Sequence, residues 1–289
     1  MSIKTCCLAL VLGCLATAST VAEVDPHPDW TNTLKPTGPA GPKLVLAAGG
    51  KARCTIVLPA KPTPQEKNAA AELSTWLGKL IGNAPPVVNE PLQPRPGGTP
   101  ISVGRTRLLA SSKLDAADAD LGEEGFGVAA SDGMLYLFGG RTRGPIYAVY
   151  AFLEEDLGCR WYAGDGATVP KAPDLSVSAF PRTYMPKLTV RDPYWREATH
   201  LRWSLRNRTN PYNVRIPEDW GGHVNYARGW FVHTFDKLVP YRTYFDEHPE
   251  YCSEVKGRRI HVVPGHRPGQ LCLTNPDVLR IATAKVLEV

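Results

Sequence analysis

The sequence has little that would tie it to a membrane or to a nucleic acid. Its longest apolar runs are too short to cross a bilayer, because a membrane-spanning helix needs about 20 consecutive residues. The net charge is +5, yet the basic residues are scattered and form no long Lys/Arg run. A nucleic-acid-binding surface needs such residues clustered on one face. We therefore expect neither a membrane span nor a nucleic-acid partner.

The motifs of several enzyme classes are also missing. Residues 139–144 (GGRTRG) lack the lysine and spacing of a phosphate-binding loop and the spaced glycines of a dinucleotide fingerprint. The chain has no Gly-x-Ser-x-Gly elbow and no His-Glu-x-x-His motif, which argues against serine hydrolases and zinc proteases. His223 and His233 are well separated and lack a third ligand motif. We expect no cofactor and no metal.

The first 22 residues have the pattern of an export signal. Lys4 supplies the positive start, residues 6–15 are apolar, and small residues near position 18 or 22 offer a cleavage site. Residues 11–14 (VLGC) also resemble a bacterial lipoprotein box, which would leave Cys14 acylated as a lipid anchor. The pattern predicts a secreted, periplasmic or cell-surface protein.

Export would leave four of the seven cysteines in the chain. They are Cys54, Cys159, Cys252 and Cys272. Each lies in an apolar or strand-like context, where a free cysteine behaves as a small hydrophobic residue. Four cysteines allow three pairings, among which the sequence does not choose. We expect buried thiols, with a Cys252–Cys272 disulfide as the alternative to check.

A folded domain is predicted to follow a proline-rich lead-in at residues 23–43. Residues 63–66 (TPQE) form a capping box, in which the Thr63 hydroxyl and the Glu66 carboxylate each cap a backbone N–H group. Apolar residues then recur at helical spacing as far as Ile81, and Gly82 provides a stop. The pattern predicts a helix over residues 64–81.

A hairpin and a second helix complete the predicted domain. Residues 126–129 and 134–138 alternate as strands around a turn at 131–133. Residues 144–157 carry apolar side chains at helical spacing and end before Gly158. We expect an α+β domain over residues 44–165, with a sheet that carries both helices on one face.

The composition changes after a second proline-rich stretch, residues 166–186, which reads as a linker. Four of the seven tryptophans and seven of the eleven tyrosines lie between residues 184 and 251. The aromatic residues fit either an apolar core or a sugar-binding surface, because their rings can pack against the apolar faces of pyranoses.

Several of these segments resemble known carbohydrate-active families. Residues 139–162 resemble the second helix of the small domain that precedes the barrel in α-glucuronidases and β-N-acetylhexosaminidases. Residues 185–191 (MPKLTVR) resemble the first barrel strand of those enzymes. Further motifs are similar to a bacterial family known as domain of unknown function 4838, which joins an α-glucuronidase-like domain to a barrel. These motifs are HTF at 233–235, HPEY at 248–251 and QLCLTNP at 270–276.

The resemblance covers roughly residues 44–289 and implies a two-part fold. Residues 44–165 would form the α+β domain, similar to domain 2 of hexosaminidases. Residues 187–289 would form the first part of a (β/α)8 TIM-type barrel, with strands near Arg191, near His223 and at 270–274. A complete barrel needs about 250 residues. We therefore expect an incomplete barrel, from the front of a longer protein or from a truncated reading frame.

The resemblance also implies a function, the processing of a polysaccharide or glycan. The substrate-binding residues that it suggests are Arg191, His223, His233 and Trp230, with Trp220 as an alternative stacking face. Arg191 could instead form a structural salt bridge, and either histidine could be satisfied by backbone groups. We predict that the three polar side chains converge on one concave surface.

No catalytic residues are assigned from the sequence. Glycoside hydrolysis usually needs two carboxyl groups, and in the related enzymes these come from later strands, which would lie beyond residue 289. The acids that are present are expected to be surface or structural carboxylates: Asp192, Glu197, Asp219, Asp236 and Glu250. Two alternatives stay open, a non-catalytic carbohydrate-binding or cell-surface module and a truncated inactive fragment.

Overall fold

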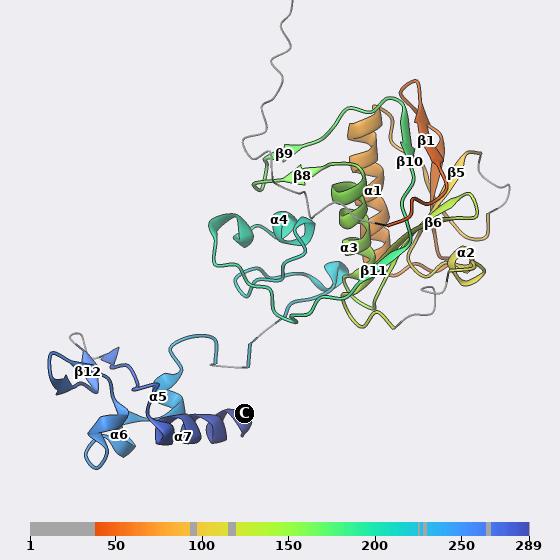
Figure 1. The fold of residues 1–289 in the computed structure, drawn as a ribbon. Coiled ribbons are helices and arrows are strands. Elements are labelled where there is room, and N and C mark those ends of the chain that lie inside the picture. The colour runs from red at the N-terminus through yellow and green to blue at the C-terminus, as the bar shows by residue number, and fades with distance from the viewer. Residues whose placement is uncertain are drawn as a thin grey trace, which may run out of the picture. The chain divides into compact units, whose positions relative to one another are not determined.

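A computed structural model of the protein describes residues 38–92, 97–114, 120–224, 226–227, 230–263 and 267–288. The predicted export signal, Cys14 and most of the predicted lead-in lie outside the described residues. The part from residue 38 to residue 224 is a layered α+β fold, in which two helices cover one face of a mixed sheet (Figure 1).

The main sheet has six strands in the order β11-β6-β7-β5-β3-β4. β3 is parallel to β4 and β5, and β5 is parallel to β7. β6 and β11 are added to this parallel core in antiparallel pairs. The strands are β3 (Cys54–Leu58), β4 (Val87–Asn89), β5 (Thr99–Val103), β6 (Phe126–Ser131), β7 (Met134–Gly139) and β11 (Arg182–Tyr184).

The two predicted helices and the hairpin are confirmed. α1 (Pro64–Ile81) begins with the capping box, in which Thr63 Oγ1 accepts from Glu66 N at 3.2 Å and Glu66 Oε2 accepts from Thr63 N at 2.8 Å. It ends at Gly82, whose φ of 96° is the left-handed conformation that glycine adopts without strain. The β6–β7 hairpin turns at Asp132 and Gly133, both with positive φ.

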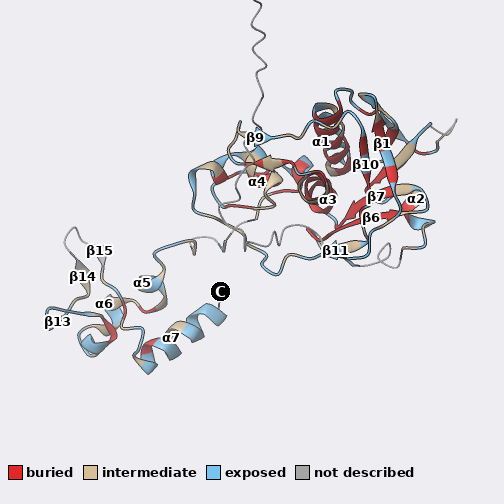
Figure 2. Cartoon of the chain, turned by 45° about the horizontal axis from the view of Figure 1, so that its top comes forward, coloured by how far each residue is buried: buried red, intermediate tan, exposed pale blue. Residues whose placement is uncertain are grey.

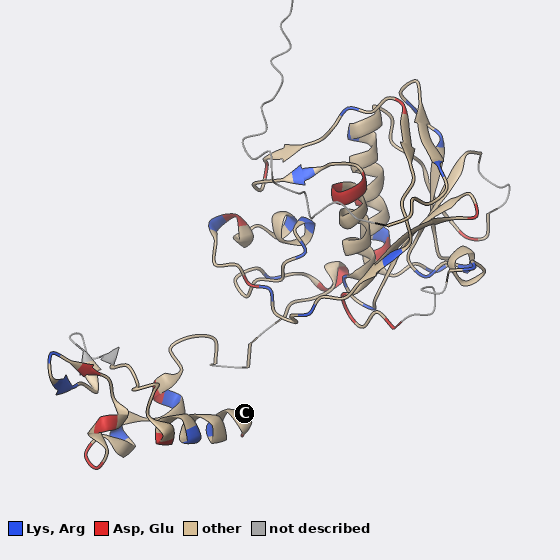
Figure 3. Ribbon diagram, viewed as in Figure 1, with Lys and Arg blue, Asp and Glu red and all other residues tan. Residues whose placement is uncertain are grey.

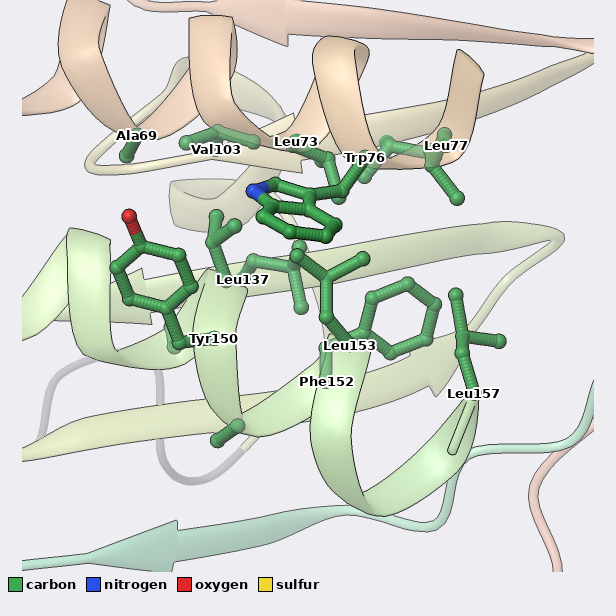
Figure 4. Packing of buried hydrophobic residues seen from close by; sticks show 14 of the residues in the cluster. Ala69, Leu73, Trp76, Leu77, Val103, Leu137, Tyr150, Phe152, Leu153 and Leu157 are labelled. Atoms are coloured by element: carbon green, nitrogen blue, oxygen red, sulfur yellow. The ribbon is translucent and has the colours of Figure 1, made fainter. Parts of the chain in front are cut away.

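The second helix, α3 (Gly144–Ala151), is buried along its whole length. It continues as a π-helical turn, η2 (Phe152–Asp156). α1 and α3 pack against each other and on the same face of the sheet. Figure 4 shows Trp76 and Leu77 of α1 facing Phe152 and Leu153 of the second helix. The prediction of two helices on one face is confirmed.

A short helix and a second sheet surround this core. α2 (Arg107–Ala110) carries Leu109, which joins Tyr136 and Phe138 in a separate small apolar cluster. The second sheet has the order β10-β1-β2. Its strands are β1 (Leu44–Ala48), β2 (Lys51–Ala52) and β10 (Leu175–Val177), and a further pair is formed by β8 (Arg160–Trp161) and β9 (Ala167–Thr168).

The predicted linker at residues 166–186 is folded into the domain instead. β10 pairs with β1, and β11 pairs with β6 at the edge of the main sheet. Arg182 of β11 also pairs with Asp156 at 2.5 Å, at the acidic turn that ends the second helix (Figure 3). The prolines of this stretch lie outside β10 and β11, where their missing N–H groups cost no ladder bond.

Residues 187–224 pack on the helices rather than forming barrel strands. Because α3 is apolar on all sides, its face away from the sheet must be covered. Leu205, Val214, Ile216 and Trp220 belong to the same buried cluster as the helices and supply that cover. The helical elements here are η3 (Arg196–Thr199), α4 (Leu201–Arg206) and η4 (Glu218–Trp220).

The barrel strands predicted near Arg191, near His223 and at 270–274 are not formed. In the described residues after Tyr184, the only strands form two short antiparallel pairs. These are β12 (Glu254–Val255) with β13 (Arg258–Arg259) and β14 (Val262–Val263) with β15 (Arg267–Pro268). A parallel barrel strand needs neighbours that bond its backbone on both sides. The backbone of Arg191 is bonded instead to Asn210, whose side chain accepts its N–H at 2.7 Å.

The described residues from 230 onward form small helices around an apolar cluster of Val239, Tyr251, Leu271 and Val278. Asn275 caps the last helix, α7, because its side chain accepts from Asp277 N and Val278 N. Figure 2 shows that most of α7 is exposed. The elements are α5 (Phe235–Leu238), α6 (Tyr241–Tyr244), η5 (Pro249–Tyr251), β12 (Glu254–Val255), β13 (Arg258–Arg259), β14 (Val262–Val263), β15 (Arg267–Pro268) and α7 (Pro276–Leu287).

The four described cysteines are free thiols. Cys252 is paired with Leu271 across an antiparallel bridge, and Cys272 N donates to Tyr251 O at 2.8 Å. Successive side chains in extended backbone point to opposite faces, so Cys252 and Cys272 point away from each other. The alternative disulfide between them is therefore not formed.

These thiols should differ strongly in reactivity. Burial raises the pKa of Cys54 to about 12 and that of Cys159 to about 11, whereas hydrogen bonding to Thr274 lowers the pKa of Cys272. Because the thiolate is the reactive form, iodoacetamide at pH 8 should label Cys272 before the other three described cysteines in the folded protein. Peptide mass spectrometry should find Cys54 and Cys159 labelled only after unfolding; rapid labelling of either in the folded protein would contradict the burial.

Candidate functional site

A buried ion network joins the sheet domain to residues 187–224. Arg143, directly before α3, has a side chain that is only 4% exposed, and its Nε donates to Glu124 Oε1 at 2.6 Å. The other carboxylate oxygen of Glu124 pairs with Arg191 Nη2 at 2.6 Å. One carboxylate therefore bridges two guanidinium groups that come from different parts of the chain.

The Arg191 side chain serves this network. Its Nη2 group is also 3.4 Å from the Tyr147 hydroxyl. Nε donates to Arg208 O at 2.9 Å, and Nη1 donates to Leu188 O at 2.7 Å and to Thr189 O at 3.4 Å. All five N–H donors thus have partners. The structure gives Arg191 a structural ion pair, one of the two roles that the sequence allowed, and its role as a sugar ligand stays a prediction.

Asn210 links the backbone around Arg191 to its own segment, which precedes η4, through hydrogen bonds. It is completely buried, and its N–H donates to Arg191 O at 3.1 Å while its amide donates to Thr189 O at 2.8 Å. The next residues of the two segments are consequently neighbours at the surface. Between them lies a hollow of about 180 Å³. It is lined by Asp192, Pro193, Tyr194, Trp195, Arg196, Ala198, Thr199, Pro211 and Asn213.

A second hollow of about 680 Å³ has one lining residue, Asn213, in common with the first. Its lining residues are Tyr212, Asn213, Arg215, Ile216, Pro217, Glu218 and His223. Arg143 holds the turn before His223, because its Nη1 donates to the carbonyls of Gly221 and Gly222. A Cβ on Gly221 would lie 2.3 Å from Arg143 Cγ, so this turn requires glycine.

His223 therefore lies in a hollow, as its predicted binding role requires. Its ring lies 6.3 Å from that of Tyr212, and its Nδ1 is buried without a hydrogen-bond partner among the described residues. Trp220, the alternative stacking face, is 9% exposed and packs under Arg202 at 4.1 Å, which makes it a core residue.

Trp230 and His233 lie in the following segment. The Trp230 ring has Lys237 Nζ 5.8 Å from its centroid. His233 is exposed and has a φ of 56°. The convergence of Arg191, His223 and His233 on one surface stays a prediction.

Most of the acids named from the sequence have structural partners. Glu197 accepts from Gly164 N at 3.0 Å, Asp236 lies 3.5 Å from Tyr241 N, and Glu250 lies 3.0 Å from His248 Nδ1. Asp219 accepts from Asn68 of α1. Asp192 differs, because it lines the first hollow.

Two other acids, both partly buried, have raised pKa values but do not form a catalytic pair. Burial is the main cause of the raised pKa of Glu155 and of Asp156, and Arg182 opposes it at both. Both carboxylates pair with Arg182, so this charge cluster is structural.

Two further features are absent from the described part of the chain. No three His, Cys, Asp or Glu side chains gather there as a metal site would require. None of the helices between residues 38 and 288 that the structure describes has the length and apolar character needed to cross a membrane.

Comparisons with known proteins define the class. Residues 47–152 match the family described as glycosyl hydrolase family 67 N-terminus, and residues 161–289 match the family described as domain of unknown function DUF4838. No curated protein matches the chain. The two family matches confirm both resemblances predicted from the sequence.

Solved structures similar to this chain include hexosaminidases from Streptomyces. A mutant β-hexosaminidase from Streptomyces plicatus, in complex with the product GlcNAc, has a TM-score of 0.38 and 14% identity. The family 20 β-N-acetylhexosaminidase from Streptomyces coelicolor A3(2) has a TM-score of 0.40 and 12% identity. Each comparison covers 86% of this chain and 42% of the other. The chain thus spans less than half the length of these enzymes.

The protein is glycosidase-like in class. More particularly, it joins a segment of the family 67 N-terminal type to a segment of the DUF4838 type. The structure places their junction, between residues 152 and 161, inside the folded body rather than in a linker.

Sequence reasoning missed Glu124, Asn210 and Asn213. Asparagine and glutamate are common surface residues, and no motif marks these three. Glu124 lies in a glycine-rich stretch before a strand. A polar side chain in such a stretch is easily taken for a turn residue. Its burial depends on Arg143 and Arg191, which are distant in the sequence.

Proposed function

We propose that this chain is the N-terminal portion of an exported glycoside hydrolase-like protein that acts on a polysaccharide or glycan. The observation that carries the proposal is the pair of family matches, which follow one another over residues 47–289. The pattern of the first 22 residues supports export, and Cys14 would be the attachment point if the protein is a lipoprotein.

A second function, carbohydrate binding without hydrolysis, is favoured by a separate observation. The described residues contain hollows with exposed aromatic rings, yet Glu197, Asp219, Asp236 and Glu250 all have structural partners. Binding requires the first feature, whereas hydrolysis usually requires two available carboxyl groups.

The proposal is tested by affinity electrophoresis of the purified 289-residue chain in gels that contain soluble polysaccharides. The panel includes xylan, β-glucan, glucomannan, glycol chitin and polygalacturonate, and bovine serum albumin serves as the non-binding control. We expect at least one polysaccharide to retard the chain relative to albumin. Equal mobility in every gel would contradict a function on glycans.

We also expect the same chain to release no nitrophenol from p-nitrophenyl glycosides and uronides. The physical reason is that each hollow is lined by only one acid, Asp192 in the first and Glu218 in the second, whereas hydrolysis usually requires two carboxyl groups around one bond. Turnover measured at 405 nm that is lost in Asp192→Asn or Glu197→Gln would contradict this prediction and would favour hydrolysis by this chain itself.

A further inference from the structure

We propose that the two adjoining hollows form one groove that binds a neutral oligosaccharide across Trp195 and Asn213. The groove is defined by the residues that line the hollows, from Asp192 to Thr199 and from Pro211 to His223. This inference rests on the proposed function and deepens it, because it assigns a binding surface and a class of ligand.

Exposed aromatic rings at the first hollow are the first reason. Tyr194 is 90% exposed and Trp195 is 56% exposed, although burial of such rings is normally favourable. Neither ring contacts another aromatic ring of the described residues. Adjacent exposed rings beside a hollow are typical of ligand-binding surfaces. Their flat apolar faces match the C–H faces of a pyranose.

The polar groups of the groove select a polyol rather than an ion. Asp192 and Glu218 accept hydrogen bonds, Arg215 donates them, and the Asn213 amide does both. The His223 imidazole, which also lines the second hollow, can donate or accept a hydrogen bond. Sugar hydroxyls both donate and accept, so they can satisfy this mixed set. The two acids and the basic residues leave no excess of one charge that would favour an ionic ligand.

The buried ion network fixes the backbone segments that carry the groove residues. Arg191 and Asn210, which bond each other's backbone, directly precede Asp192 and Pro211 at the rim. Arg143 fixes the turn that carries His223. Arg191 is thus a positioning residue, and the groove is supported by side chains that are mostly buried. A preformed site of this kind loses little conformational entropy on binding.

Asn213 connects the two hollows and so sets the length of the ligand. Because it lines both, a chain of at least two sugar residues would cross it, with one ring on Trp195 and the next beside His223. We therefore expect tetrasaccharides to bind more tightly than monosaccharides.

The test is isothermal titration calorimetry on the full 289-residue chain. The probes are neutral tetrasaccharides of xylose, glucose and N-acetylglucosamine, together with the glucose monosaccharide and tetragalacturonate. For the neutral tetrasaccharide that binds best, Trp195→Ala and Asn213→Ala should each raise Kd by about tenfold or more, which corresponds to about 1.4 kcal/mol. Tyr194→Ala should raise Kd in the same direction.

Tyr162→Ala is the matched control for Tyr194→Ala, because Tyr162 is 61% exposed and lines neither hollow. It should leave Kd unchanged, and circular dichroism should show all variants folded. Binding that Trp195→Ala and Asn213→Ala leave unaltered would overturn the groove while leaving the proposed function in place. Tighter binding of tetragalacturonate than of any neutral probe would also overturn it. No binding of any probe, together with no retardation by any polysaccharide, would contradict the proposed function itself.

Discussion

Replacing Glu124 by alanine should lower the free energy of unfolding by about 3–5 kcal/mol. The Glu124 carboxylate is 9% exposed and lies between Arg143 and Arg191, which are 4% and 17% exposed. Its removal leaves the buried Arg143 and the partly buried Arg191 guanidinium groups without their counter-charge. Urea denaturation followed by tryptophan fluorescence measures the change.

Glu123→Ala is the matched control, because the neighbouring glutamate also pairs with an arginine. Glu123 and Arg141 lie 2.7 Å apart but are 53% and 67% exposed, and exposed pairs contribute about 0–1 kcal/mol. We expect Glu123→Ala to be nearly neutral. Equal effects of the two substitutions would show that the Glu124 network is not the buried link described above.

Leu153→Asp should unfold the part of the chain that contains α1 and α3. Leu153 is completely buried, between Trp76 and the neighbouring Phe152 (Figure 4). The change removes apolar packing worth about 2–5 kcal/mol and buries an unpaired carboxylate. Together these losses are comparable with the whole stability of a domain, about 5–15 kcal/mol. Loss of the cooperative thermal transition in circular dichroism is the expected result.

The same substitution at an exposed leucine provides the control. Leu279 on α7 is 64% exposed, so Leu279→Asp should leave the thermal transition within a few degrees of that of the unmodified chain. A Leu153→Asp protein that unfolds at the unmodified temperature would contradict the position of Leu153 in the core.

Features set by neighbouring residues could be predicted from the sequence. The capping box at Thr63 acts within one helical turn, and Asp132-Gly133 determines the hairpin turn between two alternating segments. Such signals need no knowledge of the rest of the chain. They correctly gave both helices, the hairpin and the single face on which the helices pack.

Features that depend on residues distant in the sequence could not be predicted in this way. The prolines of residues 166–186 indicate a linker locally, but β10 and β11 there find partners in β1 and β6. Likewise, Leu205 and Ile216 do not show in sequence that α3 needs cover. The family resemblance correctly predicted the two family matches. It also predicted barrel strands between residues 187 and 224, where this structure has none.

The site shows the same division. Arg191, the last residue of the predicted strand, forms an ion pair with Glu124, and nothing local to residue 191 indicates that partner. His223 does line a hollow. Asn213 carries no motif, and its importance follows from the two hollows that meet beside it.

The most direct test is a crystal structure of the chain with the tetrasaccharide that binds best in calorimetry. We expect one sugar ring against the face of Trp195 and at least one hydroxyl within hydrogen-bond distance of the Asn213 side chain, about 2.7–3.2 Å. The Arg191 guanidinium should remain on Glu124. A sugar bound only at another surface, or one held by Arg191 after it has left Glu124, would contradict this account.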